Sequence, residues 1–203
     1  AVDIGGMKFD EADRSSTQFN PLLAKAGQGS PSNPIKLAEM GDPNGLNHAA
    51  FPFLSKSTGN FYIVGGDETF PWGVMATKGQ PSNPRGGFHF LNFTDPDNPK
   101  EDAVYQVPEA GSHNMWVYDD VLMAAFYQGG LRVVDISGEL LGDIYNQGRE
   151  IAVYQSSHKE GKIPNAPMVW GAQPYKDYIF FADMNSGLYC IQLEDLEKGP
   201  GAP

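Results

Sequence analysis

Two histidines occur at matching places in the chain. His48 opens the apolar run HAAFPF and His113 opens HNMWVY, while Trp170 holds the same place in a third run, WGAQPY. Imidazole nitrogens that recur around a common axis are suited to bind a metal ion or an anion. Trp170 interrupts such a set of ligands. The alternative interpretation is that each histidine hydrogen-bonds the backbone of a neighbouring unit.

Carboxylates gather where apolar runs end. They are Asp67 and Glu68 after one run, Asp183 at the end of another, and Asp119 with Asp120 between two more. Carboxylate oxygens are the ligands that calcium prefers, and with imidazole they also bind other divalent ions. The chain has no regularly spaced calcium loop of the D-x-D-x-D-G kind. Solvated turns are therefore the simpler interpretation of these carboxylates.

Aromatic side chains are a second group of candidates. Trp116 and Gln173 lie in two of the runs described above, where an aromatic binding patch and plain packing both fit the pattern. Phe70 and Trp72 lie in a stretch without strand signals, where large apolar groups are unusual unless they bind something. The sequence contains no G-x-S-x-G, phosphate-binding loop, H-E-x-x-H or C-x-x-C, so nothing places a nucleophile beside a base.

The stretch SHNMWVYDDVLMAAFYQGGLRVVDIS at 112–137 indicates the elements that hold these residues. Three short apolar runs are separated by Asp119–Asp120 and by Gln128–Gly130. A helix needs a period near 3.6 over roughly ten or more residues, and these turn residues interrupt it. The stretch therefore predicts a tight antiparallel meander of three strands.

The same unit recurs, with up to four apolar runs in a fixed order. The second runs are FYIVGG at 61–66, VLMAAF at 121–126 and YIFFAD at 178–183. The third runs are GFHFLNFT at 87–94, GLRVVDIS at 130–137 and GLYCIQLE at 187–194. The fourth runs are IKLAEM at 35–40, DAVYQ at 102–106 and IAVYQ at 151–155. Such a repeat predicts stacked four-stranded antiparallel units.

The segments GGLRVVDIS, GGFHFLNFTDPDNP and SGLYCIQLE resemble the LVIVD-repeat β-propeller family, from about residue 34 onward. The resemblance implies an all-β fold, a β-propeller of four-stranded antiparallel blades with about three blades visible. It also implies that His48, His113 and Trp170 lie on one rim of the central channel.

About three blades do not close a ring, since propellers have roughly four to eight. We therefore expect 1–203 to be a single β-propeller domain or part of one. Its open faces would be covered by another protein chain or by a missing segment of the same polypeptide. Residues 6–33 and 67–86 interrupt the repeat and are expected to be long loop excursions, where binding often occurs.

The composition of the chain disfavours some classes of binding partner. The formal net charge of −11 over 203 residues disfavours nucleic acid, whose phosphates such a chain repels. No apolar run approaches the roughly 20 residues that span a bilayer, so no membrane-spanning segment is expected. The one cysteine, Cys190, lies in an apolar run and is expected to be a buried, inert thiol.

These observations favour a non-enzymatic protein-interaction scaffold or a structural subunit of a larger extracytoplasmic assembly. The extracytoplasmic location follows from the resemblance, because LVIVD-repeat proteins are often exported or surface-linked, and no cofactor is expected. The alternative is a metal-assisted hydrolase or lyase with its site at the channel mouth. That site would bind a divalent metal through His48, His113 and either Asp67 or Glu68.

Overall fold

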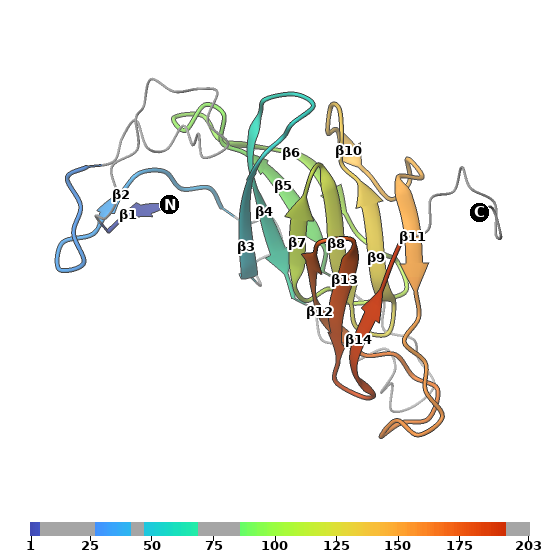
Figure 1. Ribbon diagram of the computed structural model, residues 1–203. Helices are drawn as coiled ribbons and strands as arrows, with labels where there is room; N and C mark the ends of the chain where they lie inside the picture. Colours follow the sequence, from blue (N-terminus) through green and yellow to red (C-terminus); the bar gives the residue numbers. More distant parts are fainter. Residues whose placement is uncertain (5–26, 42–46, 69–85, 194–203) are drawn as a thin grey trace, which may run out of the picture.

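The computed structural model describes residues 1–4, 27–41, 47–68 and 86–193. Within these ranges every regular element is a β-strand, and the predicted all-β class is confirmed (Figure 1). None of the described segments is a helix that is long and apolar enough to cross a membrane.

The strands follow one another closely along the chain. They are β1 (Val2–Asp3), β2 (Ile35–Lys36), β3 (Asn47–Leu54), β4 (Phe61–Asp67), β5 (Phe88–Asn92), β6 (Lys100–Tyr105), β7 (Met115–Tyr118), β8 (Val121–Phe126), β9 (Gly130–Asp135), β10 (Gly142–Asp143), β11 (Glu150–Tyr154), β12 (Val169–Tyr175), β13 (Tyr178–Asp183) and β14 (Gly187–Ile191). They form a separate two-stranded pair, β1-β2, and three larger sheets, with the orders β10-β6-β5-β4-β3 (the first sheet), β11-β9-β8-β7 (the second or middle sheet) and β12-β13-β14 (the last sheet). Neighbouring strands are antiparallel, except that the short β10 runs parallel to β6.

The predicted meander at 112–137 is confirmed as β7, β8 and β9. Asp119 and Asp120 form the two-residue turn between the first two strands, with φ angles of 52° and 55°. Positive φ at both central residues is the geometry of the tight hairpin turn that matches strand twist, and aspartate tolerates it better than most residues. Gly130, at φ 78°, opens β9 after the second turn.

The register corrects one detail of the repeat. Gly66 pairs with Phe88, as Ala125 pairs with Leu131. The first unit is therefore offset by one residue, and YIVGGD at 62–67 rather than FYIVGG is equivalent to VLMAAF. The longer connection between β3 and β4 accommodates this offset. It makes Glu68 and Tyr127 equivalent, each directly following the second strand of its sheet.

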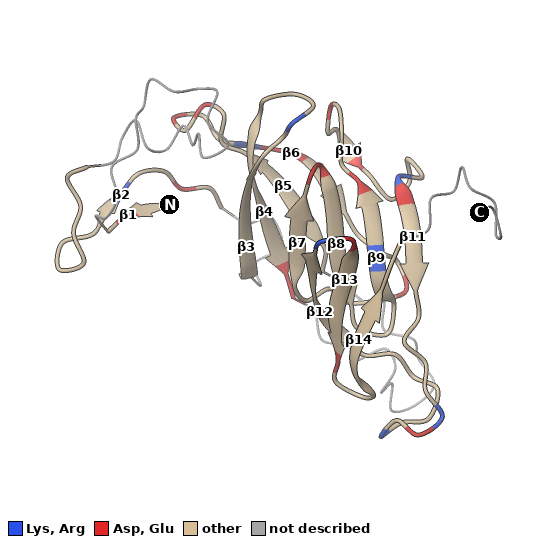
Figure 2. Cartoon of the chain, viewed as in Figure 1, with Lys and Arg blue, Asp and Glu red and all other residues tan. Residues whose placement is uncertain are grey.

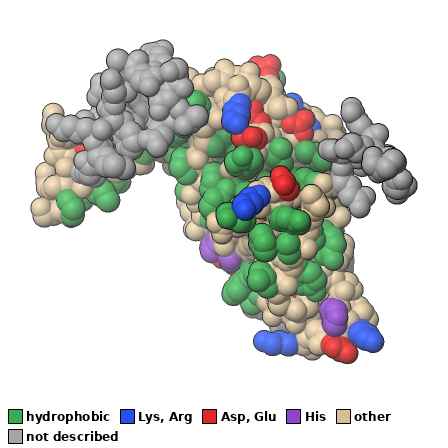
Figure 3. All heavy atoms as spheres, viewed as in Figure 1, with side chains coloured by type: hydrophobic (Ala, Val, Ile, Leu, Met, Phe, Trp, Pro, Cys, Tyr) green, Lys and Arg blue, Asp and Glu red, His purple; other side chains and the backbone are tan. Residues whose placement is uncertain are grey.

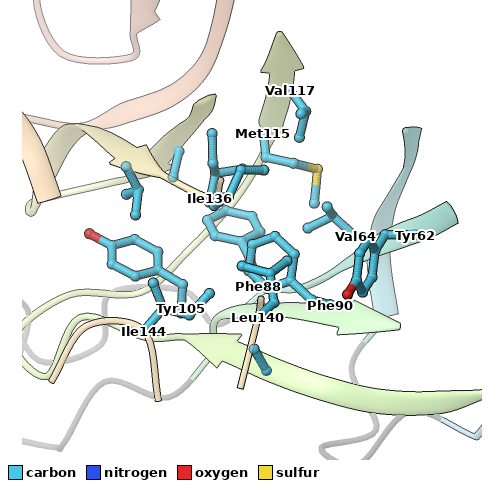
Figure 4. Packing of buried hydrophobic residues seen from close by; sticks show 14 of the residues in the cluster. Tyr62, Val64, Phe88, Phe90, Tyr105, Met115, Val117, Ile136, Leu140 and Ile144 are labelled. Atoms are coloured by element: carbon cyan, nitrogen blue, oxygen red, sulfur yellow. The ribbon is translucent and has the colours of Figure 1, made fainter. Parts of the chain in front are cut away.

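The three larger sheets stack face to face (Figure 1), and two of the three apolar clusters among the described residues fill the spaces between them. In the first core Phe126 meets Phe88 and Tyr105 edge to face, with ring centroids 5.3 and 5.5 Å from its own. Figure 4 shows Phe88 and Tyr105 within this core. The second core packs the side of β8 and β9 that carries Leu131 against Phe181 and its neighbours on β13 and β14. The sheet β7–β8–β9–β11 is thus covered on both faces.

Charged side chains lie mainly at strand ends and turns, with one basic position inside β9 (Figure 2). This is Arg132, whose guanidinium is buried and donates to Glu150 at 2.8 Å, to Glu109 at 2.9 Å and to the Gly129 carbonyl at 2.8 Å. Tyr105 donates to the same Glu150 oxygen at 2.5 Å. The network ties the first sheet to the second, because its donors and acceptors come from both.

Three aspartates expected in solvated turns, Asp67, Asp120 and Asp183, are buried instead, so that interpretation is wrong for them. Asp120 accepts backbone N–H groups from Lys56 at 3.0 Å and Ser57 at 2.8 Å, in the turn between β3 and β4. Asp183 accepts those of Met168 and Asn185, each at 2.7 Å. A buried carboxylate is stable where backbone N–H groups replace its water. Asp119 stays partly exposed and pairs with Lys56.

Cys190 is also placed differently from the prediction, because its thiol is exposed on β14. In the expected fourth run at 35–40, only Ile35–Lys36 is a strand. The expected excursions at 6–33 and 67–86 lie largely outside the described residues.

Candidate functional site

The two histidines and the tryptophan that open the three repeated units come together at one edge of the stacked sheets. His48 lies at a β-bulge near the start of β3, and Trp170 at the equivalent bulge of β12. His113 lies two residues before β7, where its N–H donates to the Ala125 carbonyl at 2.9 Å. A bulge adds one unpaired residue to a strand and re-aims its side chain. The predicted equivalence of the three positions is confirmed by this register.

Their rings contact one another in sequence order. The ring centroids of His48 and His113 are 4.2 Å apart, and those of His113 and Trp170 are 5.8 Å apart. Tyr127 adds an edge contact to His113, with centroids 5.3 Å apart. These rings therefore form a continuous row along one edge of the stacked sheets, with His48 from β3, His113 and Tyr127 from the sheet that contains β7 and β8, and Trp170 from β12.

Glu68 points its carboxylate into this row. Its Oε2 lies 3.0 Å from His48 Nδ1, and its Oε1 lies 3.9 Å from His113 Nε2. Tyr127 donates its hydroxyl to Oε1 at 2.6 Å. One oxygen of Glu68 and one ring nitrogen of each histidine all lie within 4.8 Å of one another. We name His48, Glu68 and His113 the rim cluster.

The outer nitrogens of both histidines face oxygen atoms. His113 Nδ1 lies 2.5 Å from the Trp170 carbonyl, and His48 Nε2 lies 3.1 Å from Asn114 Oδ1. A backbone carbonyl only accepts, so His113 carries its proton on Nδ1. Burial is the main influence on His113 and lowers its pKa; the hydrogen bond to the Trp170 carbonyl opposes this, His48 lowers the pKa further, and Glu68 raises it least, so that the pKa lies below its ordinary value. The resulting neutral imidazole presents the lone pair of Nε2 to the rim cluster.

Asp67, offered by the sequence as an alternative to Glu68, is not part of the rim cluster. It is the last residue of β4 and is buried. Its N–H donates to the Gly87 carbonyl at 2.9 Å, and its own carbonyl accepts the Ser112 hydroxyl at 2.7 Å. Glu68, one residue beyond the strand, has left the sheet and is free to turn toward the histidines.

Trp116 and Gln173 lie beside the rim cluster in a separate hollow. Trp116 packs against Phe51 of the first sheet, with ring centroids 5.2 Å apart. The hollow has a volume of about 440 Å³ and is lined by Trp116, Gln173, Phe180 and Leu188 among others. Phe70 and Trp72, the loop candidates, lie outside the described residues.

Two residues of the site were not anticipated. Asn114 holds His48, and no motif in the sequence marks an asparagine for that role. Tyr127 holds Glu68, and burial together with this hydrogen bond raises the pKa of its hydroxyl. The sequence repeat did not indicate Tyr127, because its equivalence to Glu68 follows only from the register that the structure shows.

The outer face of the last sheet is the second candidate surface. Its outward side chains, from β12, β13 and β14, are Gly171, Gln173, Tyr175, Tyr178, Phe180, Ala182, Leu188 and Cys190. Leu188 is 75% exposed and Tyr175 is 63% exposed. Hydrophobic side chains gather over these strands in the space-filling view (Figure 3). We name these eight residues the outer face.

No family model matches this chain, and neither a curated protein nor a solved structure matches it. Function must therefore be inferred from the side chains. Two arrangements offer themselves: the rim cluster, which converges polar ligand atoms, and the outer face, which exposes apolar ones.

Proposed function

We propose that this chain is a non-enzymatic protein-interaction scaffold, a structural subunit of a larger extracytoplasmic assembly that docks another protein chain on its outer face. The observation that carries the proposal is a pair of leucines. Leu131 and Leu188 hold the same register position in β9 and β14, paired with Ala125 and Ala182. Leu131 is fully buried under the last sheet, whereas Leu188 is 75% exposed.

The proposed partner presents an antiparallel β-sheet with an apolar face. The protein supplies its own example, because the corresponding face of the middle sheet is covered by β12–β14 in this way. The repeat of stacked, similarly ordered sheets supports the finer proposal of a β-propeller of the LVIVD-repeat kind, with these sheets as blades. In that arrangement the partner supplies the next blade.

Charge supports a protein partner at this face. The chain carries a formal net charge of −11, yet none of the eight outer-face residues is charged. An uncharged apolar patch on an otherwise acidic surface is the place where a second polypeptide approaches with the least repulsion. The extracytoplasmic location rests on the family resemblance, and cell fractionation tests it.

Light scattering and an apolar-surface dye test the docking proposal on residues 1–203. We expect dye binding and concentration-dependent association, both reduced by Leu188→Glu. Leu141→Glu is the matched control, because Leu141 is similarly exposed, at 55%, but lies outside the outer face. A stable monomer that binds little dye would overturn the proposal, as would equal effects of the two substitutions.

Metal-assisted hydrolase or lyase chemistry is the second candidate function, and the convergence of the rim cluster favours it. Such chemistry needs a bound metal with a coordination position left for water or substrate. Metal analysis of the purified protein is the first test. Stoichiometric metal that disappears in His48→Ala/His113→Ala, together with metal-dependent hydrolysis or elimination lost in the same variant, would support it over the scaffold.

A further inference from the structure

The rim cluster has the properties of a metal site rather than of a chance ion pair. Its three side chains come from two different sheets, His48 and Glu68 from the first and His113 from the second. Glu68 and His113 are partly buried, with side-chain exposures of 25% and 13%, whereas His48 is the most exposed of the three, with 29% of its side chain accessible. Partly shielded imidazole and carboxylate groups that converge on one point are the ligand set of zinc and similar transition-metal ions.

The outer hydrogen bonds orient both imidazoles as metal ligands. His113 Nδ1 donates to the Trp170 carbonyl at 2.5 Å, which leaves Nε2 unprotonated in the neutral ring. His48 Nε2 faces Asn114 Oδ1 at 3.1 Å, which leaves Nδ1 directed at Glu68. Metal-binding histidines characteristically donate their other N–H to a carbonyl or carboxylate, because this fixes the tautomer and the ring orientation.

The carboxylate is oriented in the same manner. Tyr127 donates its hydroxyl to Glu68 Oε1 at 2.6 Å, so the hydrogen-bond partner of this carboxylate is a phenol. Each of the three ligand side chains therefore has its own partner: Asn114 for His48, Trp170 for His113 and Tyr127 for Glu68. A simple ion pair does not require a separate hydrogen-bond partner for each of its side chains.

The distances fit a tetrahedral ion. Two ligand atoms that each lie about 2.1 Å from zinc in tetrahedral geometry are about 3.4 Å apart. Glu68 Oε2 lies 3.0 Å from His48 Nδ1 and Glu68 Oε1 lies 3.9 Å from His113 Nε2, on either side of that value, and one oxygen with the two nitrogens lies within 4.8 Å, so a small closure would bring them onto one ion. Calcium and magnesium prefer all-oxygen sites, so two imidazoles select against them.

We propose that His48 Nδ1, Glu68 and His113 Nε2 bind one divalent transition-metal ion of the zinc type, with a fourth position open to solvent. Asn114 and Tyr127 act as positioning residues for this site. The ion links the first sheet to the second at the rim. The proposal is independent of the outer face; it concerns binding alone, so a failed turnover assay leaves it standing while refuting the second candidate function.

Calorimetric titration of Zn²⁺ into chelator-treated protein at neutral pH is the test. We expect one zinc per chain, with affinity reduced at least about 100-fold in Glu68→Gln and in His113→Ala. The matched control is His158→Ala, which removes an exposed histidine distant in sequence from the rim and leaves affinity unchanged. Calcium and magnesium titrated in the same way are expected to give no comparable heat.

Variants of the two positioning residues provide a second test that does not depend on the folding of a ligand variant. Tyr127→Phe and Asn114→Ala retain all three ligands and are expected to weaken zinc about 10- to 100-fold, the usual effect of losing an outer partner. Circular dichroism of each variant shows whether the fold is retained. Wild-type protein that binds zinc no more tightly than folded Glu68→Gln would overturn the proposal and leave a proton-linked ion pair. Equal weakening by His158→Ala would overturn it too.

Discussion

The middle sheet, β7–β8–β9–β11, and the last sheet, β12–β13–β14, share strand order and register but differ in how many faces are covered. Leu131 and Val133 of β9 are buried beneath the last sheet. Their equivalents on β14, Leu188 and Cys190, are exposed. The side chains alternate in the same way in both sheets, as the period of two in a strand requires.

In this protein the same apolar pattern of a strand is found with either a buried or an exposed face. The pattern Gly-Leu followed by an alternating run specifies a strand with two apolar faces in either sheet. Whether the second face is buried depends on what stacks against it. The exposure of Leu188 therefore reflects what lies against that face rather than the strand that carries the residue.

The largest expected difference between the two sheets comes from their paired leucines. Leu131→Ala removes a fully buried side chain and is expected to cost about 3 kcal/mol of unfolding free energy, from lost burial and the resulting cavity. Leu188→Ala in the isolated chain is expected to change it by no more than about 0.5 kcal/mol. Urea unfolding of both variants measures the difference. Similar losses would show that the last sheet's outer face is buried after all.

The middle sheet also depends on an ionic network that the last sheet lacks. Arg132 is buried, whereas its register equivalent on β14 is Tyr189, stacked on Phe181 with centroids 5.0 Å apart. Arg132→Ala leaves Glu150 and Glu109 without their cation and is expected to cost about 2.5 kcal/mol, less than Leu131→Ala because solvent reaches Glu109, whose side chain is 56% exposed. Denaturant unfolding measures this cost, and a loss below about 1 kcal/mol would contradict it.

The hairpin turns give a smaller contrast. Asp120 and Asp177 occupy equivalent turn positions, but Asp120 is buried against the turn that contains Lys56 and Ser57, whereas Asp177 is exposed. Asp120→Asn keeps a residue that tolerates positive φ but weakens two backbone contacts, and we expect a cost of about 2 kcal/mol. Asp177→Asn is expected to be neutral. Thermal unfolding of the pair decides it, and equal shifts would refute a role for Asp120 between sheets.

Acid titration gives the smallest expected effect, and it concerns the first sheet. Burial would raise the pKa of Asp102, but hydrogen bonds from Asn92, Lys100 and Tyr62 outweigh it and lower the pKa. A carboxyl whose pKa is lowered by folding stabilises the protein above its unfolded pKa of about 3.9, and this contribution is lost as pH falls through the folded value. Asp102→Asn is therefore expected to lose stability more slowly than wild type on acidification below about pH 4. Identical acid unfolding curves would contradict this.

Much of the fold could be predicted because turns and strands are local. The turn at Asp119–Asp120 predicted the meander, and the glycine before each third run predicted that the meander recurs. The rim cluster could be predicted in part, since His48 and His113 occupy the same position in the repeat. The roles of Asn114 and Tyr127 could not, because they depend on how neighbouring sheets stack, and the burial of Asp120 depends on the same stacking.

The exposure of Cys190 was also missed, for a physical reason. An apolar run predicts burial only when something covers both faces of its strand, and the sequence of β14 resembles that of β9. Because the Cys190 thiol is exposed, its reactivity measures whether the outer face is covered.

Alkylation of Cys190 under native conditions is the most direct measurement of the central claim, that the outer face docks another protein chain. Val133→Cys in a Cys190→Ser background supplies the covered reference, because Val133 holds the equivalent position under the last sheet. We predict that Cys190 reacts rapidly in isolated residues 1–203 and is protected to the level of that reference in an untreated extract of the cells that produce the protein. Rapid reaction in both settings would contradict the account, as would protection that persists once the native polypeptide is purified to a single chain.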